Sequence, residues 1–208
     1  AAAGTCACGR SIAPFAKSVV CLDATPAMLA VGEGEAAKNG ITNMQFVNGF
    51  VEKIPFADQY FDVVLTRLAF HHFSEIEVPF SEMNRVLKRD GQLVLIDMEA
   101  AEEELREVED HIETMRDPSH VKNRSKDELL HLFEKHKYVV TKQESTTIPV
   151  SLRAWLALTK TPESTGDEIL TLMKTEIHGG KRTGFRPYLK DNEVYFYQRW
   201  LLLIGQKL

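Results

Sequence analysis

The stretch Val20-Cys-Leu-Asp-Ala-Thr-Pro-Ala-Met-Leu29 decides the fold class of this 208-residue chain. A short apolar run, Ser18 to Asp23, ends at a carboxylate. Thr25 and Pro26 then supply a helix N-cap and a proline at the first helical position. The pattern predicts a buried strand, a tight turn carrying an acid, and a helix that ends near Asn39-Gly40.

The same alternation of strand and helix continues through the first half of the chain. We expect further strands over 44–47, 61–66 and 92–97, and a helix over 77–88 that Asp90-Gly91 ends. Continuous apolar strands separated by helices are typical of a parallel sheet that is covered on both faces. The predicted fold class is therefore α/β, a doubly wound, mostly parallel sheet.

The second half of the chain is less regular. Its strongest local signal is Ser125-x-x-Glu128, a capping box that opens a helix. Periodicity predicts an acidic helix over 101–115 and helices over 152–158 and 168–177. It also predicts an outer strand over 138–150 and an antiparallel last strand over 194–208. The charge run from Glu102 to Glu113 is expected to be a solvated helix face. We see no internal repeat and no low-complexity linker, so we expect one domain over 1–208. A helical insertion within 100–190 precedes its last strand.

The first six residues, Ala1-Ala-Ala-Gly-Thr-Cys6, form a small-residue stretch typical of the loop after a strand. A parallel sheet without its central strand would expose two unpaired edges. We therefore expect a helix and a first strand to precede Ala1.

Composition excludes several classes of function. The net charge is −5, from 25 basic and 30 acidic side chains, which disfavours nucleic acid as a general partner. No apolar run reaches the roughly 18 residues of a membrane span. The cysteines Cys6, Cys8 and Cys21 are odd in number, and no basic-then-apolar leader precedes them. We expect reduced thiols, a cytoplasmic location and no metal site, because no second ligand pair at zinc spacing follows.

Ligands of doubly wound sheets bind at the carboxyl ends of the strands, so the residues there are the candidate site. Asp23 offers two acceptor oxygens, which suit a vicinal diol such as a ribose. The alternative is that Asp23 caps the next helix, although Pro26 favours Thr25 as the cap. The other strand ends carry Gly4, Asn48-Gly49-Phe50 and Arg67-Leu68.

These segments resemble the motifs of class I S-adenosylmethionine-dependent methyltransferases. More narrowly, they resemble the small branch related to the ubiquinone/menaquinone-biosynthesis methyltransferases. Order and spacing agree over residues 1–99. The matching segments are Ala2-Ala-Gly-Thr-Cys6, Val20 to Leu29, Asn48 to Phe56, Phe61-Asp-Val-Val with His71-His-Phe73, and Val86 to Leu95. Arg116-Asp-Pro-Ser-His-Val121 also resembles a segment of some members. The resemblance implies a Rossmann-like methyltransferase fold, S-adenosylmethionine as cofactor, and a small-molecule substrate.

The resemblance also implies a role for each site residue. Ala3, Gly4 and Thr5 would lie under the methionine portion of the cofactor, and Asp23 would hold the ribose hydroxyls. The remaining residues would surround the adenine (Ala24, Met28, Gly49, Phe50) or lie near the sulfonium (Arg67, Leu68).

Three positions depart from the family pattern. Ala2 and Cys6 stand where the motif has glycines. Their two side chains narrow the space that glycines would leave for a ligand beside the loop. Phe50 stands where many members have an aspartate for the adenine amine, so that contact would pass to Asn48 or to the backbone.

His71 is the candidate catalytic residue. A neutral imidazole can take a proton from a hydroxyl or a carbon acid near neutral pH. The alternative for the pair His71-His72 is a cap on a short helix, with one ring buried and one solvated. For His120 two interpretations remain: it contacts the substrate, or it is a loop residue without a chemical role.

The resemblance implies in-line methyl transfer to a small or medium organic acceptor held by the insertion after residue 99. One alternative is a nicotinamide-dependent oxidoreductase, whose G-x-G-x-x-G loop is not reproduced by Gly4 and Gly9. The other is a non-catalytic or degenerate cofactor-binding member that acts through partners, which the departures at Cys6 and Phe50 keep open.

Overall fold

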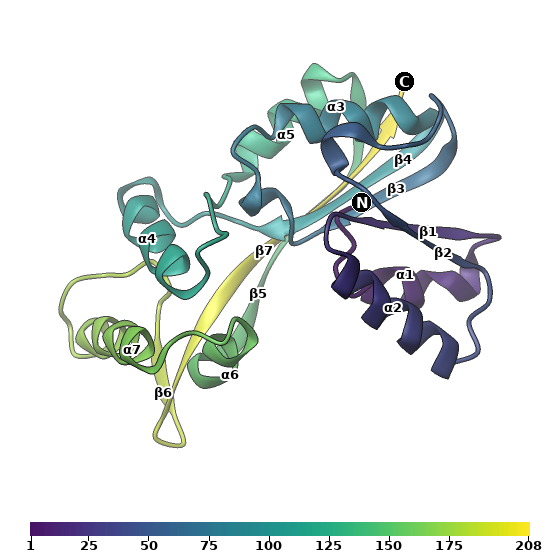
Figure 1. The fold of residues 1–208 in the computed structure, drawn as a ribbon. Helices are drawn as coiled ribbons and strands as arrows, with labels where there is room; N and C mark the ends of the chain where they lie inside the picture. Colours follow the sequence, from purple (N-terminus) through teal and green to yellow (C-terminus); the bar gives the residue numbers. More distant parts are fainter.

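The computed structural model describes residues 1–208 and contains two hydrogen-bonded sheets (Figure 1). In the first sheet, β1 (Val19–Asp23) and β2 (Met44–Asn48) are parallel. The second sheet has the order β3 (Phe61–Arg67), β4 (Leu87–Met98), β7 (Glu193–Lys207), β5 (Tyr138–Ser151), and β6 (Tyr188–Lys190) also pairs with β7. β3 and β4 are parallel, and β7 runs antiparallel to both its neighbours. The expected α/β class and the antiparallel last strand are confirmed.

The helices form three groups (Figure 1). α1 (Ala7–Ile12) and α2 (Pro26–Lys38) pack on the first sheet, and α3 (Glu77–Val86) and α5 (Lys126–Lys135) pack on the second. The third group lies along the far part of the β5–β7 ribbon and consists of α4 (Arg106–Arg116), α6 (Leu152–Leu158) and α7 (Glu163–Ile177). Short 3-10 turns complete the chain at η1 (Ala13–Phe15), η2 (Val51–Lys53), η3 (Phe70–His72) and η4 (Glu103–Leu105).

The two larger apolar cores follow this division. One fills the space between the second sheet and the helices α3 and α5, where Phe80 and Phe133 are fully buried. The other lies among α4, α6, α7 and the outer part of β7, and includes Trp155 and Phe196. The second core begins where β4 ends. The pairing of β4 with β7 stops at Met98, opposite Trp200, whereas β5 stays paired with β7 as far as Ser151, opposite Tyr195.

The junction between α3 and β4 differs from expectation. β4 begins at Leu87, and Asp90 lies inside it with a left-handed φ of 59°. The pairing with β3 shifts there, from Phe61 opposite Leu87 to Val63 opposite Gln92. Asp90-Gly91 is thus a bulge within a strand rather than a turn before one, because a left-handed residue lets extra residues fit into one strand.

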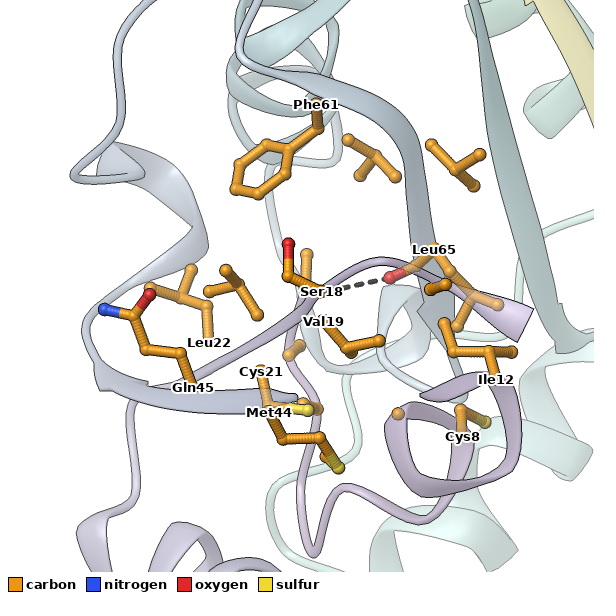
Figure 2. A pocket seen from close by; sticks show the side chains of 18 of the residues that line it. Cys8, Ile12, Ser18, Val19, Cys21, Leu22, Met44, Gln45, Phe61 and Leu65 are labelled. Carbon is orange, nitrogen blue, oxygen red and sulfur yellow. Dashed lines mark hydrogen bonds between the residues drawn. The ribbon is translucent and has the colours of Figure 1, made fainter. Parts of the chain in front are cut away.

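β1 and β3 face each other without pairing, across a cavity of about 860 Å³ (Figure 2). Val19 and Leu22 line one wall, and Phe61 and Leu65 line the other. The chain bridges the two sheets at one end of this cavity. The Ala1 amino group donates to the Leu65 carbonyl at 2.7 Å, and the Ala3 N–H donates to the Leu22 carbonyl at 2.9 Å. The strand expected before Ala1 stays a prediction.

None of the helices combines the length and the apolar character that a membrane crossing requires.

Candidate functional site

Asp23 ends β1, and its carboxylate faces the loop Ala1–Cys6. Oδ2 accepts the Gly4 N–H at 2.7 Å, and Oδ1 accepts the Thr25 N–H at 2.9 Å. Thr25 occupies the N-cap position of α2, as Pro26 favours, although its side chain makes no capping hydrogen bond. The bond from its N–H to Asp23 fixes the turn that leads into the helix. A carboxylate has about four acceptor positions, and two of them remain for another donor pair. Asp23 is half-buried, so these positions are within reach of solvent.

An exposed apolar side chain follows each of the two strands β1 and β2. Met28, in the first turn of α2, is 45% exposed, and Phe50, after β2, is 66% exposed. Asp23 is paired with Asn48 in the sheet, and the Gly49 N–H donates to the Asp23 carbonyl at 3.0 Å. Large apolar side chains left in water next to a carboxylate are typical of a ligand site.

The loop Ala1–Cys6 alternates in backbone conformation. Ala2, Gly4 and Cys6 have φ values of 49°, 52° and 59°, all left-handed. A Cβ built on Gly4 would meet nothing within 4 Å, so this residue borders open space. The two non-glycine positions are those at which the resemblance places glycines. The loop therefore keeps a glycine-type backbone path at the cost of strain in two L-residues.

Asn48 is partly committed to the backbone. Its amide nitrogen donates to the carbonyls of Asp23 and Ala24, both at 3.1 Å. This fixes the turn after β1, and it leaves the Asn48 amide oxygen as the free group. Ala24 itself is exposed.

Arg67 ends β3, and Leu68 follows it. The Arg67 guanidinium carbon lies 4.6 Å from the centre of the Trp200 ring, in a cation–π contact. Leu68 has a left-handed φ of 53°, and its N–H donates to the Ile96 carbonyl at 2.8 Å. Leucine pays a steric cost for this conformation, and such outliers are typical of functional sites.

His71 lies on η3, against the end of β4. Its Nδ1 is 2.6 Å from Oδ1 of Asp97, and both side chains are buried. Oδ2 of Asp97 accepts the N–H groups of Ala69 and Phe70, at 2.9 and 2.7 Å. The His71 carbonyl accepts the N–H groups of Val121 and Lys122, so the segment after α4 is attached to η3. Of the two adjacent rings, His71 is buried and His72 is half-buried.

α4 brings further ionisable groups towards His71. The expectation of a solvated acidic face is correct for the exposed Glu103, Glu104 and Glu107. It is wrong for Glu109 and Glu113, which are buried. Glu113 pairs with Arg116 at 3.0 Å, and Glu109 pairs with Arg199 of β7. Burial raises the pKa of the Glu113 carboxyl to about 7, although the Arg116 guanidinium and His71 oppose the shift.

His120 joins this cluster from the segment after α4. Its ring stacks on that of His71 with centres 5.7 Å apart, and its Nε2 is 2.9 Å from Oδ1 of Asp110. Burial, followed by the charge of His71, lowers the pKa of His72. No group of three His, Cys, Asp or Glu side chains has the geometry to hold a metal ion.

The expected site residues thus fall into two sets along the carboxyl ends of the strands. Ala3, Gly4, Thr5, Arg67 and Leu68 line the cavity between β1 and β3. The other residues lie outside that cavity, at the ends of β1 and β2 (Asp23, Ala24, Met28, Asn48, Gly49, Phe50) or on η3 (His71). Sequence reasoning missed Asp97 and Glu113. Asp97 had a signal, because it ends a predicted strand just as Asp23 does.

An acid at the end of β1, a left-handed loop beside it and an antiparallel last strand define a class I methyltransferase fold. Comparisons with known proteins agree. A family model described as "Methyltransferase domain" matches residues 1–95. The uncharacterized methyltransferase YcgJ of Bacillus subtilis is 32% identical over 162 residues, which are 77% of this chain and 64% of that protein. Its crystal structure aligns with a TM-score of 0.89 at 29% identity, covering 99% of this chain and 89% of the other. Residues 1–95 of the chain thus belong to the methyltransferase domain family.

Two further similarities are informative. The ubiquinone/menaquinone biosynthesis C-methyltransferase UbiE of Sinorhizobium fredii is 38% identical over 82 residues, 39% of this chain and 32% of that enzyme. The crystal structure of the [4+2]-cyclase SpnF aligns over 99% of this chain and 72% of its own, with a TM-score of 0.68 at 16% identity. The fold therefore also occurs in a protein named for another reaction, and the site residues must carry the argument for function.

Proposed function

We propose that this protein transfers the methyl group of S-adenosylmethionine to a small or medium organic acceptor. The observation that carries the proposal is the surroundings of Asp23. The carboxylate is fixed by two backbone N–H groups and keeps acceptor positions free, and the exposed side chains Met28 and Phe50 follow the ends of β1 and β2.

The residues fit the cofactor. A ribose diol needs a rigid double acceptor, which Asp23 supplies. An adenine needs apolar contacts, which Met28, Phe50 and Ala24 supply, and the Asn48 amide oxygen is free to accept from its amine. The methionine portion needs close approach to backbone, which the open side of Gly4 allows. Thr5 and Ala3 flank that glycine, while Arg67, Leu68 and Gly49 border the site at the neighbouring strand ends.

When bound, the cofactor supplies an electrophilic methyl group and its leaving group. The chain must then align the acceptor, exclude water and manage one proton. His71 is the candidate general base, because its ring lies at the strand ends between β3 and β4 and is fixed on one side by Asp97. A hydroxyl or a carbon acid is the class of acceptor that needs such a base.

The proposal includes the setting of the enzyme. Residues 1–208 would form one domain, with the helices within 100–190 on the acceptor side. All three cysteines are free thiols, as is typical of the cytoplasm. The net charge of −5 favours a small molecule over nucleic acid as substrate.

Binding experiments separate the proposal from its alternatives. Calorimetry with S-adenosylmethionine, S-adenosylhomocysteine and NAD should show binding of the two sulfur nucleosides only. Binding of NAD alone would favour an oxidoreductase. Binding of none of the three would favour a degenerate, non-catalytic protein. The departures from the family pattern at Cys6 and Phe50 are the reason to consider that alternative.

Asp23→Ala should weaken S-adenosylmethionine binding at least tenfold, because about two charge-assisted hydrogen bonds are lost. Asp23→Asn keeps one acceptor oxygen and should lie between the two proteins. Asp167→Ala removes an exposed acid on α7 and is the matched control, with unchanged affinity expected. An unchanged affinity in folded Asp23→Ala would reject the ribose role.

A further inference from the structure

Asp97 is a buried carboxylate whose oxygens are surrounded by donors. Oδ2 accepts the N–H groups of Ala69 and Phe70, and Oδ1 accepts the N–H of Met98 at 2.8 Å. Oδ1 also lies 2.6 Å from Nδ1 of His71. Three backbone N–H donors therefore favour the ionised carboxylate, which can only accept.

An ionised Asp97 determines which ring nitrogen of His71 carries the hydrogen. Because an ionised carboxylate cannot donate, Nδ1 of His71 must carry the hydrogen. A neutral ring with its proton on Nδ1 has its lone pair on Nε2. Nε2 makes no hydrogen bond with the chain, and it is not among the fully enclosed polar atoms without a partner. The free nitrogen is therefore reachable from outside.

We propose that Asp97 is a positioning residue for methyl transfer, which fixes His71 in the tautomer whose bare Nε2 takes the proton of the acceptor. The inference rests on the proposed function. The acceptor's O–H or C–H bond breaks, its electron pair stays on the acceptor, and the proton passes to Nε2. The resulting imidazolium is stabilised by the Asp97 carboxylate and returns its proton to water.

The groups around His71 come from every element packed against it. His72 lies next to it on η3 with ring centres 4.1 Å apart, and His120 stacks on it from the segment after α4. Glu113 and Arg116 approach from α4, with their side chains 3.0 Å apart, and Asp97 comes from β4. Asp97 is the only one of these with a hydrogen bond to the His71 ring, so the tautomer depends on it.

Nuclear magnetic resonance of the full chain, labelled with ¹⁵N-histidine, reads the tautomer directly. His71→Gln identifies the His71 signals by their loss. At a pH where the ring is neutral, His71 should carry its proton on Nδ1. In Asp97→Asn the amide oxygen should stay on the N–H groups of Ala69 and Phe70, which turns the NH₂ towards Nδ1. The major tautomer of His71 should then invert, with the proton on Nε2.

Asp110→Asn is the matched control, because Asp110 makes the same kind of contact with Nε2 of His120. It should change the His120 signals and leave the His71 tautomer unchanged. A wild-type His71 with its proton on Nε2 would overturn the inference, even if Asp97→Asn does not fold. An unchanged His71 tautomer in folded Asp97→Asn would overturn it as well.

Calorimetry with S-adenosylmethionine keeps the two proposals apart. Asp97→Asn should bind the cofactor within about twofold of the wild type, because Asp97 is not among the residues proposed to hold it. Wild-type protein with the expected tautomer but without cofactor binding would reject the proposed function, and with it the role of Asp97 in methyl transfer, while the control of the His71 tautomer by Asp97 would stand. Binding with the opposite tautomer would reject only the role of Asp97.

Discussion

The loop Ala1–Cys6 shows how single residues adapt to a backbone path that glycine would follow at less cost. Ala2 and Cys6 take left-handed φ values, and only Gly4 between them avoids the steric penalty. An L-residue pays about 1–2 kcal/mol for this conformation. The fold tolerates the two penalties because Asp23 and Leu22 hold the loop through hydrogen bonds to Gly4 and Ala3.

Gly4→Ala should therefore lower the free energy of unfolding by about 1 kcal/mol, through strain rather than collision. Its Cβ would point into open space, so no neighbour has to move. The same methyl group would occupy the side proposed for the cofactor, and the affinity for S-adenosylmethionine should fall as well. Chemical denaturation and calorimetry measure the two effects.

Gly34→Ala is the control for that substitution. Gly34 also borders open space, but it lies within α2 and has no left-handed φ. Alanine should raise the free energy of unfolding by up to about 1 kcal/mol through its helix propensity. Cofactor affinity should stay unchanged. Equal effects of the two substitutions on stability would show that the strain at Gly4 is unimportant.

At the scale of elements, the sequence predicts what short-range signals encode. The apolar run before Asp23 becomes β1, and both hydrogen bonds of the Ser125–Glu128 capping box are present at the start of α5. The sequence does not predict that Glu109 and Glu113 of α4 are buried. The partner of Glu109 is Arg199, ninety residues further along the chain, and no local pattern indicates such a contact. Asp97 is missed for the same reason. Its meeting with His71 depends on the pairing of β3 with β4, which no local pattern specifies.

α4 should make the stability of the protein depend on pH. The pKa of Glu113 is raised by burial from 4.5 to about 7, so the folded state holds its proton where the unfolded state has lost it. This contribution is complete below pH 4.5 and is lost as the pH rises to about 7. In Glu113→Gln the loss should be absent. The stability difference between variant and wild type should therefore shift in favour of the variant by about 2–3 kcal/mol over that range.

Urea denaturation at a series of pH values measures this shift. Glu107→Gln, at an exposed position of the same helix, is the control and should follow the wild-type curve. The Glu109 carboxyl, whose pKa burial also raises, remains in all three proteins, and so its contribution cancels. Parallel curves for Glu113→Gln and wild type would contradict the buried, protonated state of Glu113.

At the scale of the whole molecule, the two larger cores share the continuous β5–β7 ribbon. The main core lies against β3, β4 and the inner part of β7, and the second core lies on the outer part of β7. The segment from Arg116 to Lys122 connects them, because its N–H groups bond to the His71 carbonyl. A change in the second core should thus reach the candidate base through α4, while the strand ends that carry Asp23 stay intact.

Trp155→Ala tests this division. Trp155 is almost fully buried, meets Phe185 and Phe196 edge to face, and lies under the Arg116 guanidinium at 4.5 Å. The substitution should lower the free energy of unfolding of the second core by about 3–5 kcal/mol. Hydrogen exchange should show lost protection in α4, α6 and α7, with protection in α3 retained. Phe80→Ala, in the main core, should give the opposite pattern. If Trp155→Ala instead lowers protection equally in α3 and α7, the two cores unfold as one unit, and the proposed division is wrong.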